Sequence, residues 1–271
     1  MTGSGPGTAL VTGASAGIGR ELARRLAREG HRVILTARNA ERLDALAAEL
    51  TAGAGADTVV VPCDLSTSAG PAELARAIEP YEIDVLVNNA GMGASGAFAD
   101  VSPTRIAALL QLNVVSLTAL TRLLLPGMLA RRRGHILNVA STAAFQPGPW
   151  HAIYYASKAY VLSLSEAIAA EVKGTGVTVT ALCPGPTETE FFERAHMRHA
   201  PLARRGLMDA ATVAEAGIAG MKAGDPLVIP GARNRVLATL GRHGPRGLVT
   251  RVVSRLNRGR SRSDPAAGAG D

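Results

Sequence analysis

Aromatic side chains and cysteines are scarce in this sequence. Phe, Trp and Tyr together make up 3% of the 271 residues, and this content argues against a nucleic-acid platform built from stacked rings. The two cysteines, Cys63 and Cys183, are too few for a disulfide framework. We therefore expect both thiols to be free, in a reducing compartment.

Targeting and membrane segments are also lacking. The first seven residues contain neither the positive region nor the apolar region of a secretory signal. The most apolar long stretch, residues 106–130, is interrupted by Gln111, Asn113 and Arg122, so we predict that no segment spans a membrane. Together these absences lead us to expect a cytoplasmic protein.

Acidic residues are missing from one long part of the chain. Residues 231–262 hold nine Arg and no acid, whereas residues 1–230 carry 20 basic and 20 acidic side chains. The formal net charge of +7 therefore belongs to a C-terminal extension and not to the main domain.

This extension has the pattern of two short basic amphipathic helices over residues 232–257, separated by Gly244 and Pro245. One interpretation is a solvated extension packed on the edge of the domain. A second is a weak contact of residues 231–258 with anionic lipid at the inner face of a membrane. Nucleic acid, which any Arg cluster attracts, is the least favoured partner. Residues 259–271 are predicted to be disordered.

Apolar residues, in contrast, are plentiful: 47% of the chain is hydrophobic and 19% is charged. Short β-rich runs alternate with longer helical patterns over residues 6–230. This alternation predicts a single α/β domain with a doubly wound, Rossmann-type parallel seven-stranded sheet and helices on both faces. Strands are expected at residues 8–11, 32–36, 58–62, 85–88, 135–140, 177–183 and 227–229. Helices are expected at residues 17–29, 40–50, 71–79, 104–132, 153–173 and 211–223. Residues 187–207 have no clear period and are predicted to form a mobile lid.

The predicted first strand runs into a glycine-rich turn that opens a helix. Residues 12–19 read Thr-Gly-Ala-Ser-Ala-Gly-Ile-Gly. Glycines let backbone N–H groups approach a pyrophosphate, and the helix N-terminus adds about half a positive charge directed at that anion. At the start of a βαβ series this turn predicts a dinucleotide site. The alternative is close packing of helix and sheet without a ligand.

Residues at the ends of the next strands indicate which dinucleotide binds. Arg38 follows the second strand, where the adenosine ribose should lie, and a guanidinium there suits a 2′-phosphate. Arg38 therefore favours NADP over NAD, although Ala16 stands where a second basic residue would strengthen this prediction. Asp64, after the third strand, could accept a hydrogen bond from the adenine amino group or cap a turn. Small residues follow the fourth strand, where the nicotinamide ribose must pass: Asn89, Ala90 and Gly91.

Tyr154 and Lys158 are four residues apart on a predicted helix and so share one face. A phenol has a pKa near 10, and lowering it by about 3 units requires about 4 kcal/mol. One ammonium about 4 Å away supplies that amount at an effective dielectric constant of about 20. We therefore predict that Lys158 lowers the pKa of Tyr154 enough for proton exchange at neutral pH, with an oxidised nicotinamide adding to the effect.

Further polar residues are predicted to lie around the same crevice. Ser141 ends the fifth strand, Asn113 lies inside the long helix before it, and Pro184, Gly185 and Thr187 follow the sixth strand. With the glycine turn and the Tyr-Lys pair, this set resembles the short-chain dehydrogenase/reductase family, in its compact NAD(P)-dependent branch. The resemblance covers roughly residues 6–230.

The resemblance implies roles for these residues. Tyr154 would be the general acid/base, Lys158 would also hold the nicotinamide ribose, and Ser141 would orient the substrate carbonyl. Asn113 would support a water that leads protons to Lys158. Thr187 is similar to the Thr that contacts the carboxamide. The complete set of cofactor residues would be Gly13, Ser15, Ala16, Gly17, Ile18, Gly19, Arg38, Asp64, Leu65, Asn89, Ala90, Gly91, Tyr154, Lys158, Pro184, Gly185 and Thr187.

A mostly apolar substrate pocket is expected beside this set. Its predicted walls are Met92, Phe145, Trp150, His151, Phe191 and Phe192, whereas Tyr155 is predicted to pack. No cluster of His, Cys and acidic residues has metal-ligand spacing, so no metal is predicted.

The resemblance thus implies an NADP-dependent oxidoreductase that transfers a hydride between nicotinamide and a hydrophobic ketone, aldehyde or secondary alcohol, with reduction as the expected direction. The alternatives are a non-catalytic NAD(P)-binding adaptor, an epimerising or dehydrating enzyme, and a 3-oxoacyl-type reductase of lipid metabolism. The resemblance also implies a homodimer through the two long helices, with a tetramer as the alternative.

Overall fold

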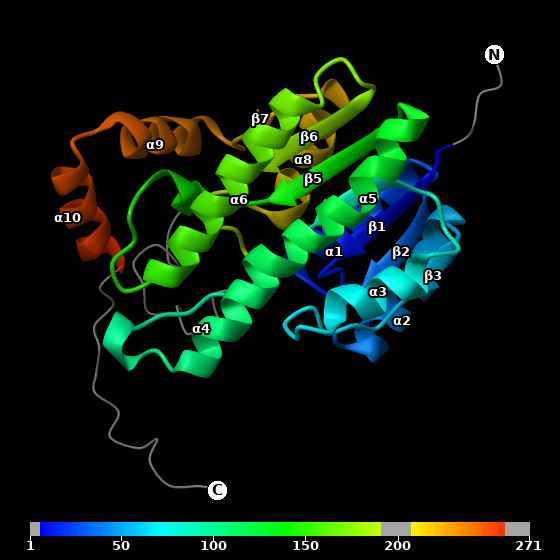
Figure 1. The fold of residues 1–271 in the computed structure, drawn as a ribbon, viewed down its shortest axis with the longest axis horizontal. Coiled ribbons are helices and arrows are strands. Elements are labelled where there is room, and N and C mark those ends of the chain that lie inside the picture. The colour runs from blue at the N-terminus through cyan, green and yellow to red at the C-terminus, as the bar shows by residue number, and fades with distance from the viewer. Residues whose placement is uncertain (1–5, 191–206, 258–271) are drawn as a thin grey trace, which may run out of the picture.

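Seven parallel strands form one sheet in the order β3-β2-β1-β4-β5-β6-β7 (Figure 1). The structure, a computed structural model, describes residues 6–190 and 207–257. Most of the predicted lid, including Phe191 and Phe192, and the predicted disordered tail lie outside these residues. The strands are β1 (Thr8–Thr12), β2 (Arg32–Thr36), β3 (Thr58–Val60), β4 (Ile83–Asn88), β5 (Gly134–Val139), β6 (Val177–Leu182) and β7 (Leu227–Val228).

Helices cover both faces of the sheet, because successive side chains of a strand point to opposite sides. Val11 of β1 packs in a core with α1 (Gly17–Arg28), α2 (Ala40–Ala54) and α8 (Ala210–Ala223). Leu10, its neighbour in sequence, packs on the other face in a core with α3 (Gly70–Ile78), α5 (Leu117–Arg131) and α6 (Ala152–Glu171). The predicted doubly wound α/β fold is therefore confirmed.

The order of the strands places a crevice at their carboxyl ends. The chain runs outward from β1 to β3 and then returns to pair β4 with the other side of β1. Connections above β1 and β4 therefore leave in opposite directions and open a gap between them. The glycine turn follows β1 at this gap, and Asn89 and Gly91 follow β4.

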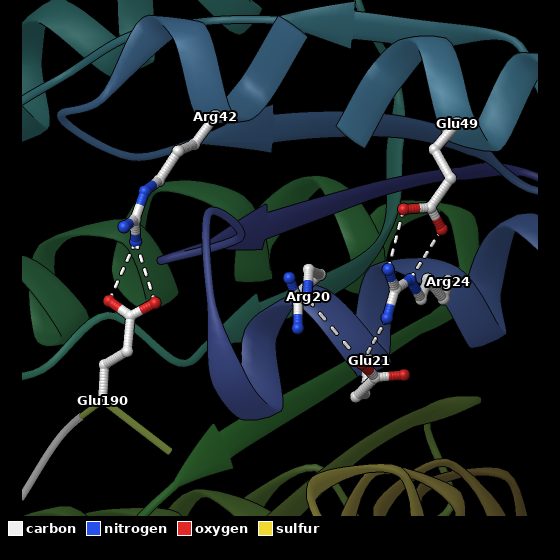
Figure 2. Close-up of polar contacts among 6 residues, drawn as sticks. All are labelled: Arg20, Glu21, Arg24, Arg42, Glu49 and Glu190. Carbon is white, nitrogen blue, oxygen red and sulfur yellow. Dashed lines mark hydrogen bonds and ion pairs between the residues drawn. The ribbon is translucent and has the colours of Figure 1, made fainter. Parts of the chain in front are cut away.

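An ion-pair network joins α1 to α2 (Figure 2). Arg24 of α1 makes two hydrogen bonds of 2.7 Å to the carboxylate of Glu49 in α2 and a third, of 2.5 Å, to Glu21. Such a bidentate contact between a guanidinium and a carboxylate fixes the orientation of the two groups as well as their distance. The network therefore holds α1, which begins at the glycine turn, against α2.

The predicted long helix over residues 104–132 contains a π-helical turn. It consists of α4 (Pro103–Leu110), the π-helix η2 (Gln111–Ser116) and α5, with the side chain of Ser102 capping its start. By length and composition this run could cross a membrane, contrary to the sequence prediction. In the fold, α5 packs one side against the sheet through Leu120 and Met128.

The C-terminal extension forms the two predicted helices, α9 (Ala232–His243) and α10 (Arg246–Asn257), which we call the C-terminal arm. In Figure 1, α9 leaves the edge of the sheet beside β7 and α10 turns back from its far end. Ala238 of α9 is buried in a cluster with Phe145, and Val253 of α10 is buried in one with Tyr155. The arm is therefore packed on the domain, close to the start of α6.

Candidate active site

One large cavity of about 1430 Å³ lies at the carboxyl ends of the strands. Ordinary ligand pockets measure roughly 300–1000 Å³, so this cavity has room for a dinucleotide and a second molecule. Every predicted cofactor residue except Gly19 lines it. Gly19 instead lies beneath the turn, where an added Cβ would come within 2.3 Å of Gly13 O. Its role is therefore the close packing of α1 against the turn.

The glycine turn has the form of an anion cradle. Gly13 and Gly17 have φ values of +66° and +54°, which favour glycine, and a Cβ on Gly17 would lie 2.9 Å from Thr189 Cγ2. The α1 N-cap residue, Ala16, offers no side-chain hydrogen bond. The first N–H groups of α1 thus remain available beside the cavity. A pyrophosphate bound there would accept hydrogen bonds from these N–H groups.

The end of β4 is fixed to this turn by hydrogen bonds. Thr12 Oγ1 accepts from the N–H groups of Asn89 and Ala90, and Asn89 Nδ2 donates to Thr12 O and Gly13 O. Strand ends that hold each other in this way position the two halves of a dinucleotide site without a ligand.

Arg38 and Asp64 lie at the adenosine end of the cavity. Arg38 is exposed. Asp64 Oδ1 accepts from the N–H and the hydroxyl of Ser66, so this carboxylate does cap a turn. Burial acts to raise the pKa of Asp64, but the hydrogen bonds from Ser66 and the charge of Arg38 lower it overall. A carboxylate that stays ionised is an acceptor, as contact with an adenine amino group requires.

The predicted catalytic residues Tyr154, Lys158 and Ser141 meet at the other end of the cavity. Ser141 lies two residues after the end of β5 and caps η3 (Thr142–Phe145) by accepting from Ala143 N. Lys158 lies one turn after Tyr154 on α6, with its Nζ 5.9 Å from the centre of the Tyr154 ring. Lys158 Nζ also donates a hydrogen bond of 2.7 Å to Val139 O, at the end of β5. All three side chains line the cavity.

The electrostatics of this trio differ from the sequence prediction. Burial raises the pKa of Tyr154 to about 12, and the side-chain hydrogen bond with Ser141 only partly opposes it. Burial also lowers the pKa of Lys158 to about 8. The structure therefore gives a raised pKa where the sequence predicted a lowered one, and burial of the phenol is the largest cause. At neutral pH Tyr154 is a neutral phenol, which is the form that donates a proton.

Asn113 is buried in the π-helical turn and does not line the cavity. Its Oδ1 accepts from Met92 N, and its Nδ2 donates to Met92 O and to Ser157 Oγ. Asn113 therefore fixes the chain after Gly91 and joins it to α6. The inserted residue of a π-turn changes the direction of a side chain, and such turns are frequent at functional sites. The water relay remains a prediction.

Several residues that were predicted to line the substrate pocket do not line the cavity. Phe145 is buried in the core, and neither Trp150 nor His151 lines the cavity. His151 Nδ1 lies 3.2 Å from Ala94 O, and burial lowers the pKa of His151. Met92 does line the cavity, and so does Tyr155, which was predicted only to pack.

The apolar wall comes instead from the C-terminal arm, which sequence reasoning did not place at the site. Aliphatic residues of both of its helices line the same cavity as Tyr154: Leu237, Leu240, Leu248, Val249, Val252, Val253 and Leu256. The apolar face of α10 that suggested a contact with lipid therefore faces this cavity. The lipid interpretation is not supported.

The end of α10 is held by two hydrogen bonds. Tyr155 donates its hydroxyl to Asn257 Oδ1, and Asn257 Nδ2 donates to Pro149 O at 3.0 Å. Asn257 is buried. This one side chain thus joins the arm to the loop before α6 and to the residue next to Tyr154.

Two further predictions concern metals and thiols. Among the described residues, no group of His, Cys and acidic side chains could hold a metal ion. Both cysteines are free, and Cys183 is buried. The expected free thiols are therefore confirmed.

Comparisons with known proteins agree with this site. The short chain dehydrogenase family model matches residues 7–199. The granaticin polyketide synthase protein of Streptomyces violaceoruber that is assigned as ketoacyl reductase 1 is 42% identical over 205 residues, which cover 72% of this chain and 75% of that protein.

Two solved structures are similar over nearly the whole chain. A short-chain dehydrogenase from Sphingobium yanoikuyae in complex with NADPH has a TM-score of 0.80 and 33% identity, covering 97% of this chain and 99% of its own. The bulky-bulky ketone specific alcohol dehydrogenase from Comamonas testosteroni has a TM-score of 0.76 and 31% identity, covering 89% and 94%. This chain therefore belongs to the short-chain dehydrogenase/reductase family and is a nicotinamide-dependent oxidoreductase acting on carbonyl or alcohol groups.

Proposed function

We propose that the protein is an NADPH-dependent reductase of bulky, apolar ketones or aldehydes, and that the C-terminal arm binds the apolar part of the substrate. The observation that carries this proposal is the aliphatic wall that α9 and α10 contribute to the cavity of Tyr154. A nicotinamide cofactor supplies the hydride when it is bound.

The protein's own residues supply the proton and orient the substrate carbonyl. Tyr154, a neutral phenol with a pKa of about 12, donates its proton to the carbonyl oxygen as that oxygen gains charge. Ser141 holds the same oxygen by a hydrogen bond. Lys158, fixed on Val139 O, places a positive charge near the ring that loses the proton.

Arg38 supports the choice of NADP. Its guanidinium lines the adenosine end of the cavity and carries a charge that a 2′-phosphate would meet. The Sphingobium yanoikuyae structure, which contains NADPH, is similar over nearly the whole chain. These two observations favour NADP over NAD.

The substrate side is apolar on the arm and polar only near the catalytic residues. Burying one methylene on such a wall stabilises a complex by about 0.8 kcal/mol, or about fourfold in affinity. The aliphatic wall should therefore favour bulky substrates over small ones. The Comamonas testosteroni enzyme, which is specific for bulky-bulky ketones, supports the same substrate class.

A 3-oxoacyl reductase is the second candidate. The Streptomyces violaceoruber relative, which is assigned as a ketoacyl reductase, favours it, and an acyl chain would also suit an aliphatic wall. The two candidates differ in the group one methylene away from the ketone, which is a thioester carbonyl only in the second.

Initial rates of NADPH oxidation test the proposal. The panel comprises cyclohexanone, a diaryl ketone and a 3-oxoacyl thioester, each measured also with NADH. We expect the highest kcat/KM with the diaryl ketone and NADPH. A preference for the thioester would support the second candidate, and equal rates with the small and bulky ketones would reject the role of the arm.

A matched pair of variants isolates the wall. Leu240 and Val236 both lie on α9 and are both 59% exposed, but only Leu240 lines the cavity. Leu240→Gln should raise KM for the diaryl ketone about fivefold and leave that for cyclohexanone unchanged, whereas Val236→Gln should change neither. Equal effects of the two substitutions would contradict the proposal.

A further inference from the structure

Arg42 and Glu190 form an ion pair at the edge of the cavity, beside the glycine turn (Figure 2). Arg42 Nη1 donates to both carboxylate oxygens of Glu190, at 3.0 and 2.8 Å. The two residues are 148 positions apart in sequence, and both line the cavity. The contact therefore brings the segment after β6 against the start of α2.

Both partners are held in place by their own segments. Asn39 caps α2 by accepting from Arg42 N at 2.8 Å, so Arg42 belongs to the first turn of that helix. Thr189, next to Glu190, packs over Gly17 of the glycine turn. Glu190 thus follows a residue that contacts the glycine turn, and it lines the cavity.

Arg42 is also four residues after Arg38, which lies just before Asn39, the N-cap residue of α2. Arg38 lines the same cavity and has no salt bridge with the described residues, although its charge lowers the pKa of Asp64. The adenosine end therefore has two guanidinium groups, of which one already holds an anion that belongs to the protein itself.

A carboxylate and a phosphate offer a guanidinium the same kind of contact, two anionic oxygens facing planar N–H donors. We propose that Arg42 is a second ligand of the 2′-phosphate of NADP, and that Glu190 occupies Arg42 as a competing anion until the phosphate replaces it. This inference rests on the proposed use of NADP. NAD, which has a hydroxyl at that position, leaves the Arg42–Glu190 pair intact.

The exposure of the pair makes this exchange easy. The two side chains are 46% and 45% exposed, and an exposed ion pair contributes little to stability. A phosphate brings up to two negative charges to Arg42 and Arg38 together, whereas Glu190 brings one to Arg42. The phosphate should therefore win the competition, but at a reduced apparent affinity.

The pair between Arg24 and Glu49 does not share this property. Neither residue lines the cavity, and Arg24 is held by three hydrogen bonds that join α1 to α2. Competition for an anion site is thus specific to Arg42 and Glu190, not a general consequence of ion pairs around the turn.

The test is calorimetric titration of the full chain with NADPH and with NADH. Glu190→Gln removes the competing charge and should tighten NADPH binding two- to fivefold with no change for NADH. Arg42→Gln removes the phosphate ligand and should weaken NADPH binding about tenfold, again with no change for NADH. In the Arg42→Gln background, Glu190→Gln should have no further effect.

Glu188→Gln is the matched control. Glu188 lies two residues from Glu190 and is exposed, but it does not line the cavity. Glu188→Gln changes the net charge of the protein by the same amount as Glu190→Gln. If Glu188→Gln tightens NADPH binding as much as Glu190→Gln, the effect is a general one of charge and the inference is wrong. Unchanged or weaker NADPH binding by Glu190→Gln also overturns it.

The unsubstituted protein separates this inference from the proposed function. If it binds NADH as tightly as NADPH, the NADP preference fails and the inference fails with it. If it prefers NADPH while Arg42→Gln and Glu190→Gln change neither affinity, only the inference fails and Arg38 remains the sole candidate ligand.

Discussion

The hydroxyl of Tyr155 donates a hydrogen bond to Asn257 Oδ1, 3.3 Å away, across 102 positions of sequence. Tyr155 follows Tyr154 in the first turn of α6, and Asn257 is the last residue of α10. The apolar wall and the acid/base group of the site are therefore connected through adjacent residues.

Asn257→Ala should loosen this connection. Both of its hydrogen bonds are lost, and each contributes about 1 kcal/mol to stability. We expect KM for a bulky ketone to rise about fivefold, while kcat for cyclohexanone stays within twofold. Tyr155→Phe, which removes only one of the two bonds, should have a smaller effect on the same KM. A uniform loss of kcat for both ketones would contradict this role.

Tyr154→Phe should abolish turnover and leave NADPH binding nearly unchanged. The substitution removes the only atom that donates the proton and keeps the ring that lines the cavity. Steady-state rates and calorimetric titration of NADPH measure the two effects separately. Residual activity within a factor of ten of the unsubstituted protein would reject Tyr154 as the acid.

The rate should depend on pH through Lys158 before Tyr154. With the Lys158 pKa at about 8 and that of Tyr154 at about 12, reduction should be constant from pH 6 to about 7.5 and fall above about 8, as the ammonium loses its proton. A pH profile of kcat/KM for reduction measures this. A profile that stays flat to pH 10 would show that the charge of Lys158 is not needed.

Stability should change with pH in the opposite sense. The folded-state pKa of Lys158 lies below its unfolded value near 10.4, so the unfolded chain binds more protons between about pH 8 and 10.4. The contribution of Lys158 to the free energy of unfolding should therefore rise by an amount on the order of 3 kcal/mol across that window. Urea unfolding of the protein and of Lys158→Met at several pH values isolates this slope.

Arg38→Asp should shift cofactor preference toward NAD. An aspartate repels the 2′-phosphate and accepts a hydrogen bond from the free ribose hydroxyl instead. We expect the ratio of kcat/KM for NADPH to that for NADH to fall at least tenfold. An unchanged ratio would remove Arg38 from the phosphate site.

The two long helices should form a homodimer contact. The run from α4 to α5 exposes Val115 and Leu123, each 48% exposed, and α6 exposes Tyr160. Leu123→Arg places a charge in this apolar surface and should convert a dimer to a monomer in light scattering. A protein that is already monomeric would show that the surface has another use.

The sequence predicted the cofactor end well because its residues lie at strand ends. A parallel sheet brings the carboxyl ends of β1, β2 and β4 together whatever the details of packing, so Gly17, Arg38 and Asn89 meet as expected. Ser141, at the end of β5, could be placed for the same reason.

The direction in which a side chain or a helix face points could not be predicted from the sequence, although its position along the chain could. Apolar periodicity over residues 104–132 indicates a helix but does not register one inserted residue, so the π-turn around Asn113 was missed. Trp150 has a φ of +71°, and no pattern in the sequence signals that reversal. The amphipathic pattern of α10 showed which residues share a face but not what that face contacts.

The C-terminal arm begins at Gly231, after the last strand, and can therefore be treated as an exchangeable part. Tyr154 and Lys158 on α6 and Ser141 after β5 carry the proposed proton chemistry, while α9 and α10 line the space beyond them. Grafting a differently shaped arm after β7 would thus retune which molecules are accepted and leave the chemistry untouched, a route open equally to natural selection and to engineers of chiral alcohols.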